Sequence, residues 1–174
     1  MKKILLTLSM TALLLFTAGC SCPFSDKTAD SKPQMNTAAA SAAETAPDFS
    51  YKELGSGKTM RLSDLKGKPV FINFWATWCP PCVGELPHIE KKYAEYKDKM
   101  HFVILSVDDN EQEPARFIQS KGYTFPAAYG DHQALGRAYS IDAIPASYII
   151  SADGRIVAST VGSMNEASLD AFLQ

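Results

Sequence analysis

The chain has 174 residues, of which 46% are hydrophobic and 21% are charged, and its formal net charge at pH 7 is −2. This length and apolar content are enough for one domain with a hydrophobic core, together with further segments outside it. Lys and Arg number 17 against 19 Asp and Glu, so no excess of positive charge favours nucleic acid, and we expect no nucleic-acid partner.

The N-terminus has the organisation of an export signal. Two lysines precede an apolar stretch over residues 4–18, which is shorter than the roughly 20 residues that a membrane-spanning helix needs. The stretch ends in Phe-Thr-Ala-Gly-Cys, which resembles a bacterial lipobox, although Thr17 stands where lipoboxes usually have leucine. We expect residues 1–19 to be a lipoprotein-type signal peptide and Cys20 to carry the lipid. The alternatives left open are a signal cut by the ordinary peptidase and a signal left uncut.

Residues 20–46 are expected to hold the lipid attachment and a flexible tether. Residues 21–46 contain seven alanines, four serines and three threonines, with Phe24 as their one aromatic residue. Such a segment cannot bury enough apolar surface to fold, so we expect the folded part to start near Pro47. Cys22 is left without an assigned role.

Residues 47–174 are expected to form one α/β domain, in which apolar strands alternate with amphipathic helices. A small hairpin around a Gly-Ser-Gly turn should come first. The expected strands lie at 49–54, 58–62, 70–75, 101–107, 125–129, 147–151 and 155–160, and the expected helices at 80–97, 111–121, 133–139 and the C-terminus. Asp153-Gly154 is a strong hairpin signal between the last two strands, and a capping box of Ser163 and Glu166 is expected to open the final helix.

The helix expected at 80–97 has one apolar and one charged face. Its buried stripe is formed by Leu86, Ile89, Tyr93 and Tyr96, and its water-facing residues by Glu90, Lys91, Lys92 and Glu95. Pro87 interrupts this helix and is expected to kink it. The alternation of elements predicts a mixed central sheet with helices on both faces, where chemistry sits beyond the carboxyl ends of parallel strands.

The strand at 70–75 leads into Cys79-Pro-Pro-Cys82. Pro80 and Pro81 fit the first turn of a helix, where their missing N–H groups cost little, so Cys79 should occupy the N-cap. A helix N-terminus carries about half a positive charge and stabilises a thiolate, which makes Cys79 the expected nucleophile. Because Pro81 has no N–H, the N–H of Cys82 is the remaining donor to the sulfur of Cys79.

Cys82 lies one helical turn from Cys79, where it can attack a mixed disulfide formed on Cys79, and we expect the two sulfurs to differ in exposure. Such a dithiol passes two electrons by thiol–disulfide exchange. The alternative is half of a structural zinc site, which needs two more ligands at a compatible spacing. The remaining candidate ligands are scattered or lie before the folded part, namely Cys20, Cys22, His88, His101 and His132. We therefore expect a redox pair, with no metal and no cofactor.

The folded part, residues 47–174, resembles a thioredoxin-fold domain of the TlpA/ResA type, a family of exported, membrane-tethered thiol–disulfide oxidoreductases. The resemblance rests on Trp78-Cys79-Pro80-Pro81-Cys82, on Glu85 followed by Leu86-Pro87, on an extra segment between Val107 and Ile144, and on Ile144-Pro145 before a strand. It implies a thioredoxin fold with a mixed central sheet, helices on both faces and an N-terminal β-hairpin extension.

The resemblance also implies how a substrate binds. Ile144-Pro145 matches the family's cis-proline, which packs opposite the cysteine pair and offers backbone to an incoming peptide. The alternative is a trans proline that starts an edge strand. Trp78, Pro80 and Pro81 would contribute to the docking surface beside Cys79.

Glu85 shares a helix face with Cys82, and the family keeps an acid at this position. The resemblance implies that Glu85 relays the proton of the Cys82 thiol from a poorly solvated site, whereas the alternative is a solvated surface glutamate. Asn73 stands where cytoplasmic thioredoxins have a buried aspartate, so proton handling should fall to Glu85.

The expected function is that of an extracytoplasmic reductase of exported protein disulfides, on the periplasmic side or the cell surface, anchored by lipid at Cys20. No basic residue lies between the cysteines, which favours a reductant. Apocytochrome c is the family's best-known client, electrons would come from a membrane electron donor, and we expect a monomer.

The alternatives are a peroxiredoxin-like thiol peroxidase and a copper-delivery module. Ala76 and Ile72 stand where the peroxidase has its Thr or Ser and its Pro, and the copper family spaces its cysteines CxxxC.

Overall fold

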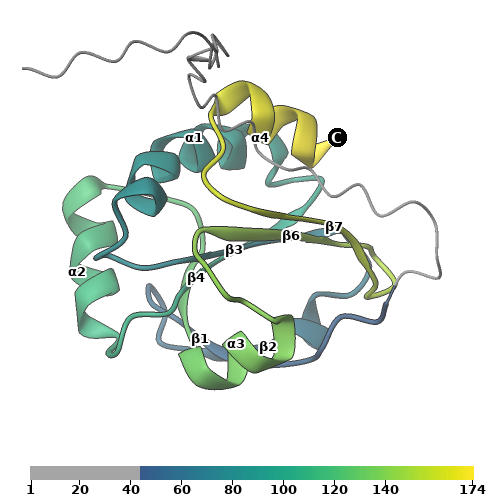
Figure 1. Ribbon diagram of the computed structural model, residues 1–174, viewed down its shortest axis with the longest axis horizontal. Helices are drawn as coiled ribbons and strands as arrows, with labels where there is room; N and C mark the ends of the chain where they lie inside the picture. The colour runs from purple at the N-terminus through teal and green to yellow at the C-terminus, as the bar shows by residue number, and fades with distance from the viewer. Residues whose placement is uncertain (1–43) are drawn as a thin grey trace, which may run out of the picture. The chain divides into compact units, whose positions relative to one another are not determined.

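The computed structural model describes residues 44–174. The signal peptide expected at 1–19, the lipid site at Cys20 and most of the tether lie outside the described residues. A seven-stranded sheet in the order β2-β1-β5-β4-β3-β6-β7 forms the centre of the described domain (Figure 1). No helix within residues 44–174 is both long enough and apolar enough to cross a membrane.

The elements occur in the predicted order. The strands are β1 (Ser50–Glu53), β2 (Thr59–Arg61), β3 (Val70–Trp75), β4 (His101–Ser106), β5 (Ala127–Tyr129), β6 (Ala146–Ile150) and β7 (Ile156–Val161). The helices are α1 (Pro80–Tyr96), α2 (Gln112–Lys121), α3 (His132–Tyr139) and α4 (Glu166–Leu173), with a 3₁₀ helix η1 (Leu62–Leu65) before β3. The chain therefore has the predicted α/β fold with the N-terminal hairpin extension.

Strand pairing explains why β3 is continuously apolar. β3 runs parallel to β4, from Val70 beside His101 to Trp75 beside Ser106, and antiparallel to β6. All six residues of β3 are buried, because the strand has a neighbour on each side and helices on each face. β4 pairs in parallel with β5, and the β1–β2 hairpin adds to β5 in the antiparallel direction.

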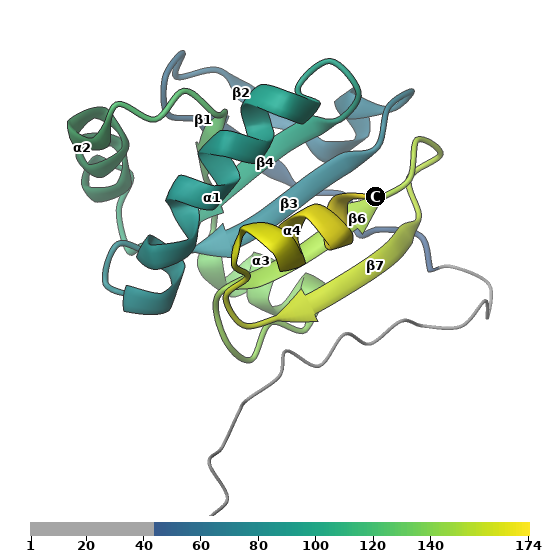
Figure 2. The same ribbon diagram turned by 90° about the horizontal axis from the view of Figure 1, so that it is seen from above.

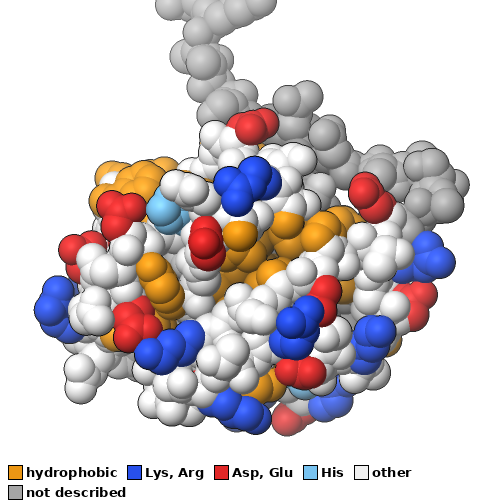
Figure 3. All heavy atoms as spheres, turned by 90° about the horizontal axis from the view of Figure 1, so that it is seen from below, with side chains coloured by type: hydrophobic (Ala, Val, Ile, Leu, Met, Phe, Trp, Pro, Cys, Tyr) orange, Lys and Arg blue, Asp and Glu red, His pale blue; other side chains and the backbone are white. Residues whose placement is uncertain are grey.

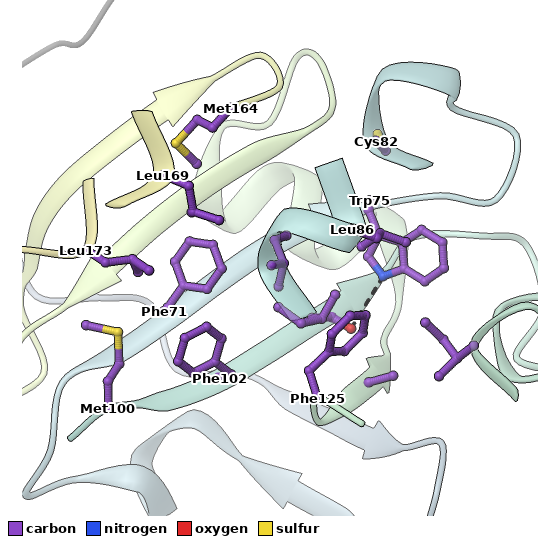
Figure 4. Packing of buried hydrophobic residues seen from close by; sticks show 14 of the residues in the cluster. Phe71, Trp75, Cys82, Leu86, Met100, Phe102, Phe125, Met164, Leu169 and Leu173 are labelled. Carbon is purple, nitrogen blue, oxygen red and sulfur yellow. Dashed lines mark hydrogen bonds between the residues drawn. The ribbon is translucent and has the colours of Figure 1, made fainter. Parts of the chain in front are cut away.

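The helices divide the core into two layers. α1 and α4 lie over one face of the sheet and α3 lies under the other, as Figures 1 and 2 show from two directions. The side chains of β3 alternate between the layers: Phe71 and Trp75 belong to the α1 layer, whereas Ile72 and Phe74 belong to the α3 layer. In the α1 layer, the indole of Trp75 donates a hydrogen bond to the carbonyl of Ile104 at 3.4 Å (Figure 4).

One prediction for α1 is wrong, because Lys92 does not face water. It is buried, with 6% of its surface exposed, and its ammonium group donates to Glu95 and to Asp170, each at 2.7 Å. Asp170 belongs to α4, so Lys92 lies where α4 packs against α1. The long lysine side chain is covered there while its charge remains paired.

The start of the folded part also differs slightly from the expected Pro47. Thr45 forms an antiparallel bridge with Arg155, and the N–H of Ala46 donates to the carbonyl of Gly154 at 2.9 Å. Ala46 is buried as a result. The backbone thus joins the sheet two residues earlier, which composition alone does not indicate.

The expected capping box at α4 is wrong as well. The N-cap is Asn165, whose side-chain oxygen accepts from the N–H of Ser168 at 2.9 Å, and Glu166 is the first helical residue. Ser163 is exposed and precedes the helix by three residues. Asn and Ser are both strong N-cap residues, so the sequence offers two starting points only two residues apart.

This cap generates a prediction about stability. Asn165→Ala should lower the free energy of unfolding by about 1 kcal/mol, because α4 loses its cap while it buries Leu169 and Leu173. Ser163→Ala, the matched control, should change it by less than about 0.5 kcal/mol. Denaturant unfolding of both variants measures the difference, and a larger loss for Ser163→Ala would place the cap at Ser163 after all.

Candidate active site

The cysteine pair lies at the carboxyl end of β3. The N–H of Cys79 donates to the carbonyl of Ala76 at 3.2 Å, which closes a turn between β3 and α1. Cys79 is the N-cap of α1, and Pro80 and Pro81 are the first two helical residues. The sulfur of Cys79 accepts from the N–H of Cys82 at 3.3 Å. The N-cap position and the donor predicted from the sequence are both confirmed.

Cys79 and Cys82 are joined by a disulfide, with their Cα atoms 5.3 Å apart. The contrast in exposure expected for the two residues is small in this oxidised form, since Cys79 is 5% and Cys82 1% exposed. Their surroundings do differ. Both belong to the hydrophobic cluster on the α1 side of the sheet, but Cys79 also lines an open groove, whereas Cys82, in the first turn of α1, does not (Figure 4).

The loop before β6 lies opposite the turn of residues 76–79 between β3 and α1, which we call the redox turn. The Ile144–Pro145 peptide bond is cis, as the resemblance implied, and the carbonyl oxygen of Ile144 lies 3.8 Å from the sulfur of Cys79. This meeting follows from the sheet, because β6 runs antiparallel to β3 and Ala146 pairs with Phe74 near the end of that strand. The sheet therefore brings a backbone carbonyl from residue 144 to the reactive cysteine.

A groove of about 540 Å³ runs beside Cys79. Trp78 and Pro80 line one side, and the other side consists of residues from α3 and the loop that follows it, among them His132 and Asp142. Trp78 is 65% exposed, which makes it the most exposed large hydrophobic side chain of residues 44–174. Viewed from the α3 side, hydrophobic side chains gather in hollows between charged ones (Figure 3). Pro81 is exposed but does not line the groove.

Glu85 is buried behind the disulfide, with 1% of its surface exposed. One carboxylate oxygen accepts from the N–H of Met164 at 3.3 Å, and the other lies 3.5 Å from the amide nitrogen of Asn73. Burial raises the pKa of Glu85 to about 7, and these two hydrogen bonds offset part of the increase. The alternative of a solvated surface glutamate is therefore wrong.

Asn73 links Glu85 to β6. It lies on the α1 side of β3, and its amide nitrogen donates to the hydroxyl of Ser147 at 3.0 Å. Its side-chain oxygen has no hydrogen-bond partner, and it is the only buried side-chain nitrogen or oxygen atom in residues 44–174 without one. An unpaired buried carbonyl costs about 1–3 kcal/mol of folding free energy.

Asp108 is a site residue that the sequence analysis missed. It is fully buried and accepts hydrogen bonds from the backbone and hydroxyl of Thr77, two residues before Cys79, and from the hydroxyl of Ser106. The available signal was a pair of polar residues, Ser106 and Asp108, at the carboxyl end of an apolar strand.

The histidines considered as zinc ligands lie on separate elements. Within residues 44–174, no group of three or more His, Cys, Asp or Glu side chains is placed to hold a metal ion. His88, His101 and His132 lie on α1, β4 and α3 respectively.

Comparisons with known proteins agree with this geometry. Residues 41–173 match the model of the Redoxin family. The thiol-disulfide oxidoreductase ResA of Bacillus thuringiensis (strain Al Hakam) is 35% identical over 130 residues, which cover 74% of this chain and 75% of that protein.

Two solved structures share the fold. One is a thiol:disulfide interchange protein of the thioredoxin family from Chlorobium tepidum TLS, with a TM-score of 0.68 and 29% identity, covering 78% of this chain and 97% of that one. The other is the pneumococcal exposed lipoprotein thioredoxin (Etrx1) of Streptococcus pneumoniae strain TIGR4, with a TM-score of 0.64 and 26% identity, covering 73% and 98%. The chain thus belongs to the redoxin family and, within it, to the ResA-type thiol-disulfide oxidoreductases.

Proposed function

We propose that this thiol-disulfide oxidoreductase works outside the cytoplasm and reduces disulfides of exported proteins through Cys79 and Cys82. The observation that carries the proposal is the position of Cys79. Its sulfur caps a helix N-terminus, opens on a groove and faces the carbonyl of Ile144. A disulfide that lies at a helix N-terminus and borders a groove can exchange with the cysteines of a protein bound there.

The reaction starts from the dithiol form. The thiolate of Cys79 attacks one sulfur of a client disulfide, a new S–S bond forms between Cys79 and that client cysteine, and the second client cysteine leaves as a thiolate. The thiolate of Cys82 then attacks the sulfur of Cys79 and releases the first client cysteine. Two electrons have passed to the client, and the enzyme holds the Cys79–Cys82 disulfide.

Glu85 is suited to receive the proton of Cys82 in the second step. The two residues are three apart on α1 and therefore share a helix face. With a pKa of about 7, the carboxyl group of Glu85 exists in both protonation states near neutral pH. A group of this kind can take a proton from a thiol and return it later.

The surroundings of Cys79 favour a reductant. Pro80 and Pro81 supply no N–H groups, so among the first three residues of α1 only Cys82 can donate its N–H to the sulfur of Cys79, which it does at 3.3 Å. Among the charged and titratable residues, the groove contains His132 and Asp142 but no Lys or Arg. Because this thiolate has so little stabilisation, the dithiol form is a stronger reductant. Strong oxidants, by contrast, owe their potential to a stabilised reduced form.

The N-terminal sequence supports a location outside the membrane. The export signal at 1–19, the lipobox-like Cys20 and the Ala-rich tether support a domain held outside a membrane by lipid. One structural neighbour is itself named an exposed lipoprotein thioredoxin. A membrane electron donor would return the Cys79–Cys82 disulfide to the dithiol, and apocytochrome c is a client of the right chemistry.

The roles of the two cysteines can be separated by substitution. Cys79→Ser should abolish reduction of a protein disulfide, because the attacking sulfur is lost. Cys82→Ser should accumulate mixed disulfides on Cys79, because the resolving sulfur is lost. Non-reducing electrophoresis with mass spectrometry, on cells producing each variant, would display the trapped exported proteins. Equal trapping by both variants, or trapping of cytoplasmic proteins alone, would contradict the proposal.

Glu85→Gln should slow turnover at pH 7 by about a hundredfold, the low end of general acid–base contributions, while the fold stays intact. The matched control is Glu113→Gln, which changes an exposed carboxylate on α2. Steady-state reduction assays between pH 5.5 and 8.5 would measure both. A rate and a pH profile equal to those of the unaltered protein would make Glu85 only a structural residue.

The raised pKa of Glu85 also predicts how stability depends on pH. Between the ordinary value of 4.5 and about 7, the folded protein holds a proton that the unfolded chain has lost. The stabilisation is therefore complete below pH 4.5 and disappears as pH rises through 7, a loss of about 3 kcal/mol. Relative to Glu85→Gln, the unaltered protein should lose this amount in denaturant unfolding between pH 4.5 and 8. A difference that stays constant with pH would contradict the raised pKa.

A further inference from the structure

Asp108 is the second buried carboxyl group behind the redox turn, and the mechanism above does not use it. The residue is fully buried and follows β4 by two positions. One of its oxygens accepts from the hydroxyl of Thr77 at 2.6 Å and the other from the hydroxyl of Ser106 at 2.7 Å. The backbone N–H of Thr77 lies 3.1 and 3.2 Å from the two oxygens.

These partners suit an ionised carboxylate. A backbone N–H can only donate, and a carboxylate can only accept, so the contacts to Thr77 are satisfied without a proton on Asp108. None of the ion pairs found within residues 44–174 includes Asp108. The fold therefore keeps a negative charge in its interior with neutral hydrogen-bond donors alone, which is costly and calls for a reason.

The sheet register places this charge beside the redox turn. Trp75, the last residue of β3, pairs with Ser106 of β4, and the N–H of Val107 donates to the carbonyl of Trp75 at 2.9 Å. Asp108 therefore meets the first residues after β3. Thr77 and Cys79 are two residues apart, so their Cα atoms are separated by at most about 7 Å.

We propose that Asp108 is a positioning residue that fixes the redox turn and whose buried charge disfavours the thiolate of Cys79, which keeps the Cys79–Cys82 disulfide hard to reduce. This deepens the proposed function, since it rests on Cys79 being the attacking sulfur and supplies a cause for the reductant poise. A negative charge near a thiol opposes loss of its proton. Destabilising the thiolate destabilises the reduced form and shifts the equilibrium towards the disulfide.

Asp108→Asn tests the charge, because asparagine keeps the shape and one acceptor oxygen. The matched control is Asp109→Asn, which removes the same charge from the adjacent exposed residue. We expect the pKa of Cys79, measured from the rate of iodoacetamide alkylation against pH, to fall by about one unit in Asp108→Asn and to stay unchanged in the control. In a glutathione buffer at a pH above the pKa of Cys79 in both proteins, the equilibrium constant should move about tenfold towards the dithiol, equivalent to about 30 mV.

The other titratable side chains around Cys79 are unchanged in both variants. They are Cys82 and Glu85 on α1, His132 on α3 and Asp142 in the loop before β6. The proposal is overturned if the pKa of Cys79 stays unchanged and the glutathione equilibrium constant remains within twofold of that of the unaltered protein. This holds even if the unfolding midpoint falls. That pattern would make Asp108 a structural clamp alone.

Thr77→Val provides a second test if Asp108→Asn does not fold. It removes the hydroxyl that donates at 2.6 Å but leaves the charge of Asp108, now less well neutralised. The pKa of Cys79 should stay equal or rise, and Thr77→Ser should restore it; a fall in Thr77→Val would overturn the proposal. Both tests compare variants with the unaltered protein, so they remain decisive whether its own potential is that of a reductant or an oxidant.

Discussion

The pairing of β3 between β4 and β6 is the constraint on which the rest of the site depends. It buries all six residues of β3 and directs the chain, at the carboxyl end of that strand, into the N-terminus of α1. The same pairing brings Ile144 from the β6 side and Asp108 from the β4 side to the turn that carries Cys79. Strand register thus decides which groups surround the sulfur.

Two buried acids, one on α1 and one after β4, give the site its electrostatic character. Glu85 lies on the buried face of α1 with its pKa raised to about 7 by burial, so it can hold or release a proton near neutral pH. Asp108 lies behind the turn and accepts from neutral donors. Neither arrangement stabilises a thiolate, and both cost folding free energy, as expected where function and stability compete.

Local patterns in the sequence predicted the elements and the centre of the site. The apolar run of β3, the two prolines and the hairpin signals are short-range features, so the fold class and the N-cap at Cys79 could be derived directly. The cis state of Pro145 came from the family resemblance, because its cause lies in tertiary packing that a local pattern does not contain.

The features that escaped prediction depend on contacts between distant parts of the chain. Lys92 is buried because α4 brings Asp170 to it, 78 residues later. Asp108 acts on Thr77, 31 residues earlier, and nothing in its immediate sequence identifies that partner. Composition and spacing describe one element at a time, whereas these side chains are defined by which elements meet.

The reduction potential of the Cys79–Cys82 pair tests the central claim most directly, namely that this site is built to give electrons to other disulfides. It can be measured by equilibrating the domain with glutathione or dithiothreitol buffers and following the fluorescence of the exposed Trp78 beside the pair. The account predicts a value nearer to about −270 mV, typical of thioredoxin, than to the roughly −120 mV of a strong oxidant. A value above about −180 mV, in the range of disulfide isomerases, would contradict it.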